Sequence, residues 1–418
     1  MGEPVDSPRM MTLPVVSVDL DAREAEWEFA AGRAIGGFTF NGRVPGPLIE
    51  AEAGATIHAR LTNTLPQPTT IHWHGLRVPA DMDGTEAVQP PVQPGGTFDY
   101  EFVAPDAGTF WYHSHVNETE QLERGLYGGL VVRGPAEPRL DAERLLHLDD
   151  LKLDASGEPA PFGDPHEQHE GREGDVRLVN GVQEPELEIA SGQIERWRIV
   201  NAANTRFVRL SIGGRPFKII GTDGGLIPAP LEATEVLITP GERADLAVGP
   251  FDEGEVLDIE ALPYDRGRGE PRRERFATLR VGPGAPSDAD IPPTLRQIDP
   301  LADPDVEPNR IVSLKALMHG GEHQRDEPVL VGELQVWDLV NETSQDHPFH
   351  LHGFFFQVVA ENGAQPKTIA WKDTVNVPRK EQVRIAWLPD DRPGEWMYHC
   401  HILEHHAIGM MAHFQVVA

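Results

Sequence analysis

The chain has 418 residues and a net charge of −31, with 39% hydrophobic and 25% charged residues. This length predicts two to four domains. A strongly acidic surface disfavours binding to nucleic acid and to anionic membranes, and it aids solubility. No apolar run approaches the ~20 residues that a transmembrane helix needs. We therefore expect a globular protein that neither binds nucleic acid nor inserts into a membrane.

The N-terminal segment shows no targeting signal. Met1–Val16 lacks the basic stretch followed by an apolar stretch that defines a secretory signal peptide. We expect a periplasmic or secreted protein if a leader was removed, and a cytoplasmic one otherwise. The single cysteine, Cys400, excludes an intrachain disulfide.

A repeated frame divides the chain into three units. Gly54–Asn63 reads GATIHARLTN, Gly192–Asn201 reads GQIERWRIVN and Gly332–Asn341 reads GELQVWDLVN. Apolar residues alternate within each copy, and this period of two indicates a β-strand. A spacing of about 140 residues between copies is enough for one β-sandwich or Greek-key barrel in each unit.

The composition agrees with this architecture. Short apolar runs between 41 Gly and 38 Pro residues predict an all-β fold of three consecutive Greek-key β-sandwiches or barrels, with little helix. We place the domains at residues 1–135, 136–290 and 291–418. Two segments, Pro161–Asp175 and Pro263–Arg275, are predicted to be long surface loops, with His166 and His169 solvated in the first.

Eight of the 18 histidines form four His-x-His pairs, and these fall at equivalent positions of the first and third units. Residues two apart on a strand face the same side, so each pair directs two imidazoles to one place. A single pair would more often be ordinary core or surface residues. Four pairs arranged in this way predict one shared multinuclear metal site between the outer units. The pairs are His72 and His74, His113 and His115, His350 and His352, and His399 and His401.

Residues of the opposite strand parity form a second set. Cys400 lies between His399 and His401 and therefore faces away from their imidazoles. His347 is three residues before His350 and also has the opposite parity. We expect these side chains to line a separate site on the other face of the same strands.

The second set has the donors of a blue-copper site. One thiolate, two imidazoles and a thioether are supplied by Cys400, His347, His405 and Met410, and this set is typical of electron-transfer copper. A small buried apolar cysteine is the alternative for Cys400, and Met411 is the alternative to Met410. Because adjacent Cα atoms are only ~3.8 Å apart, the two sites would be joined by a short covalent route.

At these motifs the sequence resembles the multicopper oxidases, the laccase-like family. The resemblance is carried by HWHG, WYHSH, HPFHLHG and HCHILEHHAIGMM, and it extends along the whole chain, including the histidine-poor second unit. It implies three cupredoxin-like domains and four coppers per chain: one type 1, one type 2 and two type 3. The implied ligands are His347, Cys400, His405 and Met410 for type 1, His72 and His350 for type 2, and His74, His113, His115, His352, His399 and His401 for type 3.

The resemblance also implies a mechanism. Four single-electron oxidations at the type 1 site would feed a cluster that reduces dioxygen to two waters, with Cys400 as the relay. Asp83 is expected to relay protons, with a plain turn residue as the alternative. Many bacterial relatives have an acid where this chain has His406, so His406 either shuttles protons or is simply exposed. Glu404 either orients His405 or is an exposed loop carboxylate.

The expected electron donors are phenols and aromatic amines. An axial methionine favours easily oxidised donors, and no methionine cluster is visible near the type 1 motifs among the eight Met residues. Oxidation of cuprous, ferrous or manganous ions is the alternative function. A copper carrier or a scaffold without metals is disfavoured because every ligand position is filled. Three repeats disfavour a two-domain copper nitrite reductase.

Overall fold

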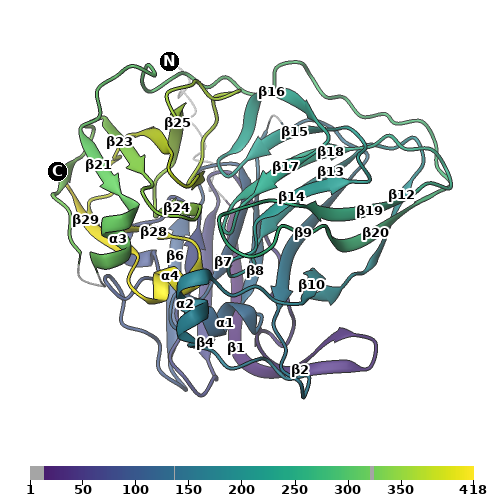
Figure 1. The fold of residues 1–418 in the computed structure, drawn as a ribbon, viewed down its shortest axis with the longest axis horizontal. Helices are drawn as coiled ribbons and strands as arrows, with labels where there is room; N and C mark the ends of the chain where they lie inside the picture. The colour runs from purple at the N-terminus through teal and green to yellow at the C-terminus, as the bar shows by residue number, and fades with distance from the viewer. Residues whose placement is uncertain (1–13, 136, 321–323) are drawn as a thin grey trace, which may run out of the picture.

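The computed structural model describes residues 14–135, 137–320 and 324–418, so most of the segment considered for a signal peptide lies outside the described residues. Short strands dominate, which confirms the all-β prediction. They form six sheets, in three consecutive pairs along the chain. Each pair encloses a hydrophobic core of its own. Figure 1 shows the three pairs side by side, the last at the left and the middle one at the right.

The first pair of sheets has the strand orders β2-β1-β4-β6 and β3-β8-β7-β5. β1 pairs parallel with β4 and antiparallel with β2. The strands are β1 (Val15–Ala30), β2 (Arg33–Phe40), β3 (Ile49–Glu52), β4 (Thr56–Asn63), β5 (His72–His74), β6 (Thr97–Val103), β7 (Gly108–His113) and β8 (Tyr127–Arg133).

The middle pair has the orders β11-β10-β9-β13-β18-β15-β16 and β12-β20-β19-β14-β17. The strands are β9 (Ala142–Leu151), β10 (Val176–Val179), β11 (Val182–Gln183), β12 (Glu186–Ala190), β13 (Glu195–Asn201), β14 (Val208–Ile212), β15 (Phe217–Thr222), β16 (Gly225–Ala233), β17 (Val236–Ile238), β18 (Arg243–Val248), β19 (Val256–Leu262) and β20 (Glu274–Gly282).

The last pair has the orders β21-β23-β27-β25 and β22-β29-β28-β24-β26. The strands are β21 (Arg310–Ser313), β22 (Val329–Leu330), β23 (Gln335–Val340), β24 (His347–Leu351), β25 (Phe356–Glu361), β26 (Thr374–Val377), β27 (Gln382–Trp387), β28 (Gly394–Cys400) and β29 (Met411–Val417).

The described helices are short, and three of them meet at the centre of the molecule. α1 (Glu118–Glu123) and α2 (Pro165–Glu170) both contact α4 (Leu403–Ala407). A 3-10 turn, η1 (Ala80–Met82), and α3 (Leu314–Gly320) complete the set. None of the described helices is long and apolar enough to span a membrane.

The asparagine that ends each repeat has a structural reason. Asn63, Asn201 and Asn341 are buried, and each side-chain amide donates hydrogen bonds to two backbone carbonyls of the neighbouring loops, at 2.7–2.9 Å. One buried amide thus satisfies two buried carbonyls, each of which would cost free energy if left unpaired. The asparagine of each repeat therefore holds equivalent backbone segments in place in the three sandwiches.

Two of the sequence predictions need correction or stay open. The predicted surface loop Pro161–Asp175 contains α2 and a fully buried guanidinium, Arg172, which pairs with Glu123 and Glu167. In the segment Pro263–Arg275, Arg266 is also buried. The guanidinium groups of Arg172 and Arg266 form ion pairs within the protein, which the composition of these segments does not predict. The domain boundaries at residues 135/136 and 290/291 stay predictions.

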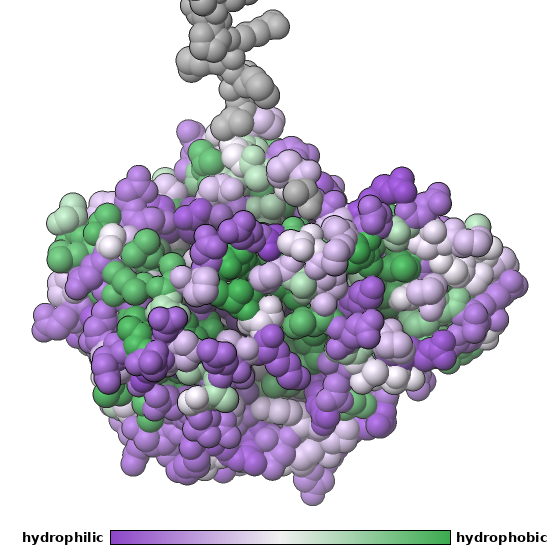
Figure 2. Space-filling view, turned by 90° about the horizontal axis from the view of Figure 1, so that it is seen from above, coloured by the Kyte–Doolittle hydropathy of each residue, from purple (hydrophilic) through white to green (hydrophobic). Residues whose placement is uncertain are grey.

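Polar side chains predominate on the face in Figure 2, with smaller apolar areas between them. This fits the net charge of −31.

Candidate metal centres

The four His-x-His pairs lie on neighbouring strands of two sheets or run one to two residues past the strand ends. In the first unit, β5 pairs with β7 so that His72 lies opposite His113. In the third unit, β24 pairs with β28 so that His350 lies opposite His399. The equivalent strand of the middle unit, β14, carries Leu210 and Ile212 in the hydrophobic core instead.

The structure brings all eight imidazoles together between the outer units. Their ring nitrogens form overlapping triads whose donor atoms lie within 4.8 Å of one another. Two of these triads have no residue in common, and another joins His72 and His350, whose Nε2 atoms are 3.4 Å apart, to His74. Of the two separate triads, the first is His74, His113 and His401, and the second is His115, His352 and His399.

The imidazoles are suited to bind metal. Burial lowers the pKa of His113, His352 and His401 well below the ordinary value, so the rings are neutral at physiological pH, which is the form that ligates. Both ring nitrogens of His401 and Nε2 of His115 are buried and have no hydrogen-bond partner among the described residues. Because buried polar atoms are normally paired, these nitrogens fit metal ligands better than core residues.

The second donor set lies on the other face of β28. Cys400 Sγ lies 3.5 Å from His347 Nδ1 and 3.6 Å from His405 Nδ1. Met410 is fully buried in the same core as the cysteine, and its carbonyl accepts the Cys400 N–H at 3.1 Å. Burial raises the pKa of the thiol, so a cation at this place is needed to hold the thiolate. The donor set fits a soft cation such as copper.

Asp83 touches two of the imidazoles. Its carboxylate accepts from His352 Nδ1 at 2.8 Å, and its backbone carbonyl accepts from His72 Nδ1 at 2.9 Å. Asp83 is 1% exposed. Such contacts fix which nitrogen of each ring faces a metal.

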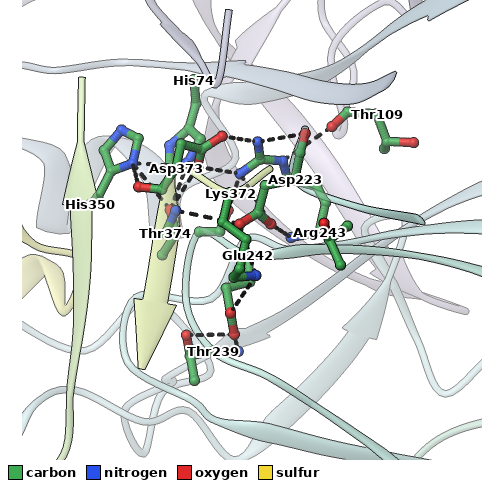
Figure 3. A network of polar contacts seen from close by, with 12 residues as sticks. His74, Thr109, Asp223, Thr239, Glu242, Arg243, His350, Lys372, Asp373 and Thr374 are labelled. Carbon is green, nitrogen blue, oxygen red and sulfur yellow. Dashed lines mark hydrogen bonds and ion pairs between the residues drawn. The ribbon is translucent and has the colours of Figure 1, made fainter. Parts of the chain in front are cut away.

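Sequence reasoning missed a second buried carboxylate, Asp373. It accepts from His74 Nε2 at 3.1 Å, and its backbone carbonyl accepts from His350 Nδ1 at 3.0 Å. Figure 3 shows Arg243, from β18 of the middle unit, paired with this carboxylate on the side away from His350. Burial opposes ionisation, but Arg243 holds the pKa of Asp373 well below its usual range. The middle unit therefore supports the cluster although it supplies no imidazole to it.

Two glycines are required by this close packing. Gly75, the last residue of HWHG, has φ +86°, and a Cβ there would lie 2.3 Å from the Arg243 guanidinium and 2.7 Å from Asp373. Gly241, also with φ +86°, lies against the ring of His401, where a Cβ would come within 2.8 Å. Only glycine allows this backbone conformation together with these contacts.

Known proteins share this chain's sequence and fold. Multicopper oxidase family models match residues 21–137, 150–253 and 292–418. Multicopper oxidase MmcO of Mycobacterium tuberculosis is 32% identical over 91% of this chain and 83% of its own length. The cell division protein FtsP of Edwardsiella tarda is 32% identical over 85% and 80%.

Among solved structures, a Campylobacter jejuni multicopper oxidase described as a metallo-oxidase superposes with a TM-score of 0.84. It has 29% identity and covers 97% of this chain and 94% of its own. The chain belongs to the multicopper oxidase family. It is a copper-dependent oxidoreductase, and the multicopper oxidase structures that it matches have cupredoxin-like domains, as the sequence motifs predicted.

A third carboxylate of the oxidase, Glu118 in α1, was also missed from sequence. Its Oε1 lies 3.0 Å from His115 Nδ1 and its Oε2 lies 2.8 Å from His406 Nδ1. His406 is only 8% exposed, so the alternative of a simply exposed side chain is wrong. Glu118, at the start of α1, thus places a carboxylate between His115 and His406. The only sequence signal was its place three residues after His115.

Glu404 also differs from the expectation of an exposed carboxylate. It is 4% exposed, and it accepts hydrogen bonds from Thr205 Oγ1 at 2.7 Å and Asn204 Nδ2 at 3.0 Å. No hydrogen bond joins it to His405 in the described part of the chain. Glu404 ties α4 to the middle unit, and its predicted effect on His405 stays a prediction.

His405 is covered by the α2 segment. Its Nε2 donates to the backbone carbonyl of His169 at 3.2 Å, and the Gln345 amide donates to the same carbonyl at 2.9 Å. His405 has no exposed surface, and burial lowers its pKa to about 3. His169 therefore contacts the candidate type 1 site through its backbone, which the prediction of a solvated loop histidine missed.

Proposed function

We propose that this oxidase takes single electrons from phenolic or aromatic amine donors and uses them to reduce dioxygen to water at four coppers. The position of Cys400 carries the proposal. Its sulfur lies between two imidazoles on one face of β28, whereas the adjacent His399 and His401 belong to the imidazole cluster on the other face.

The proposed ligand division is the one that the family resemblance implies, and the grouping of donor atoms is compatible with it, although His74 also groups with His72 and His350. The two triads contain all six residues assigned to the type 3 pair, and His72 and His350 are left for type 2. The cysteine and its two imidazole neighbours support a type 1 site with Met410 as the fourth ligand. This gives one type 1, one type 2 and two type 3 coppers.

Bound copper would supply one-electron transfer at the cysteine site and four-electron reduction of dioxygen at the imidazole cluster. The protein's residues hold these sites in place. Asp83 and Asp373 accept imidazole N–H groups and fix the orientation of the rings. Asp83 is also the carboxylate that we propose relays the protons consumed when water forms, since it contacts a cluster histidine.

Oxidation of small metal ions is the second candidate, and the cover over His405 favours it. A phenol ring cannot touch His405 while the His169 carbonyl occupies Nε2, whereas a metal ion can donate an electron from outside the cover. The names of the relatives are compatible with both kinds of electron donor, organic molecules and metal ions, since one relative is named a laccase and another is described as a metallo-oxidase.

The test combines copper content with donor selectivity. We expect close to four coppers per chain and dioxygen uptake with a phenolic donor, measured by elemental analysis and an oxygen electrode. Comparing kcat/KM for a phenol, an aromatic amine and ferrous or cuprous ions decides between the donors. Activity limited to metal ions would favour the second candidate, and fewer than two coppers without oxygen uptake would refute both.

A further inference from the structure

A cavity of about 550 Å³ opens beside the imidazole cluster. It is lined by β28, β29, the start of α1 and the loop at Thr85–Ala87. His115 lies in its wall and is 7% exposed, whereas the other seven imidazole residues of the cluster are at most 1% exposed. Within the described residues, this cavity is therefore the place where solvent comes nearest to the cluster.

Soft donor side chains line one wall of the cavity. In the β28–β29 hairpin, Met397 lies opposite His413 and His399 lies opposite Met411. These four side chains share one face of the hairpin, and directly opposed Cβ atoms lie only ~4.5–5.5 Å apart. Met397, Met411 and His413 line the cavity, and His399 belongs to the cluster. The hairpin thus presents a row of thioethers and imidazoles that ends at the candidate metal site.

These side chains lie between the core and the cavity: Met397 is buried, and Met411 and His413 are partly buried. Met397 and Met411 belong to none of the hydrophobic cores found among the described residues, unlike the neighbouring Met410. His413 Nδ1 is buried without a hydrogen-bond partner in that part of the chain, and Glu395 Oε1 lies 3.9 Å away. Burial lowers the pKa of His413, so its imidazole is neutral and free to ligate.

We infer that Met397, Met411 and His413 form a transit site for a cuprous ion that is on its way from solvent to the imidazole cluster. Thioether and imidazole donors select Cu(I). The nearby Glu395 is already paired with Arg325, so the donor atoms, and not the local charge, select the ion. The inference rests on the proposed function, since it assumes that the cluster is filled with copper. The site is separate from the type 1 site, because Cys400 faces the other side of β28.

The first test follows copper uptake. Copper-free protein carrying Met397→Leu and Met411→Leu, a volume-conserving change, is given buffered Cu(I) without oxygen, and retained copper per chain is measured over time after desalting. We expect cluster filling at least about tenfold slower than in the wild type, with the same final content. Filling from Cu(II), which depends less on thioethers, should be unchanged. Met318→Leu, in α3 against the core of the third unit, is the matched control. Equal Cu(I) uptake rates in the double variant and the control would overturn the inference.

The second test locates the ion directly. Crystals of the copper-loaded protein are soaked with Ag(I), a redox-inert substitute for Cu(I). Anomalous density in contact with the Met397 and Met411 sulfurs is expected, and its absence would overturn the transit site. If wild-type protein takes up no cluster copper from either oxidation state, the proposed function fails, while a silver soak of copper-free crystals still tests whether the cavity binds the ion.

Discussion

At the scale of single residues, strand parity separates two sets of donors. Cys400 and its neighbours His399 and His401 are consecutive, yet the cysteine faces two other imidazoles while its neighbours face the cluster. The carboxylates that orient the cluster come from distant parts of the chain, and Asp373 also depends on Arg243 of the middle unit.

Replacing Cys400 by serine tests the proposed relay. We expect loss of about one copper per chain, of the blue absorption and of oxygen uptake, because a hydroxyl does not replace a thiolate ligand. Visible spectra, copper content and oxygen uptake are measured. Ser114 occupies the equivalent position between His113 and His115, so Ser114→Ala is the control, which should cost about 1 kcal/mol of stability and keep the colour. Turnover that survives Cys400→Ser would contradict the relay.

Asp373→Asn tests the support of the cluster. The change removes the closer of the two carboxylates that pair with the buried Arg243 and leaves only Asp223, 3.7 Å away. It should lower the free energy of unfolding by up to about 3–5 kcal/mol and weaken copper retention about 10–100-fold. Asp223→Asn is the control, since Asp223 pairs with Lys372 and Arg243 and contacts no cluster imidazole. Urea unfolding and copper competition with a chelator measure the two effects. Equal copper retention in the two variants would show that Asp373 has only a structural role.

At the scale of elements, the short helices connect the units at the site. α2 lies over His405 and is held by the Arg266 guanidinium, which donates to the Glu170 carbonyl at 2.7 Å, and by Arg172. α4 is tied to the middle unit through Glu404. Access of a donor to His405, the proposed type 1 ligand, therefore depends on an element of a different unit.

Loosening α2 should change donor selectivity. Replacing residues 162–166 and 168–170 by Gly and Ser, while keeping Glu167 to pair with Arg172, removes the helix but not the buried ion pair. We expect kcat/KM for a bulky phenol to rise at least about tenfold, equivalent to removing about 1.4 kcal/mol of opening cost. Ferrous ion serves as the internal control and should change little. A phenol rate that stays the same would mean that α2 does not limit access.

At the scale of the whole molecule, the charge of −31 sets the long-range field. Polar side chains predominate over the face seen in Figure 2. Such a field attracts cationic donors and repels anionic ones, and salt screens both effects.

Ionic strength should therefore act in opposite directions on charged donors. Between about 0.01 M and 0.15 M salt the screening length falls from about 30 Å to about 8 Å. We expect kcat/KM to fall up to about tenfold for a cationic aromatic amine and to rise for an anionic phenol. A neutral phenol controls for effects of salt on the enzyme itself. Parallel responses of all three donors would show that the field does not steer them.

The sequence alone determined the three repeats, the four histidine pairs and the opposite facing of Cys400. These follow from the period of two in a β-strand, which fixes the face of each side chain within a short segment. Tertiary structure decided the grouping of the imidazoles, the support from Asp373 and Arg243, the Glu118–His406 contact and the cover over His405. Each of these joins residues far apart in the chain, and strand periodicity carries no information about which distant segments meet.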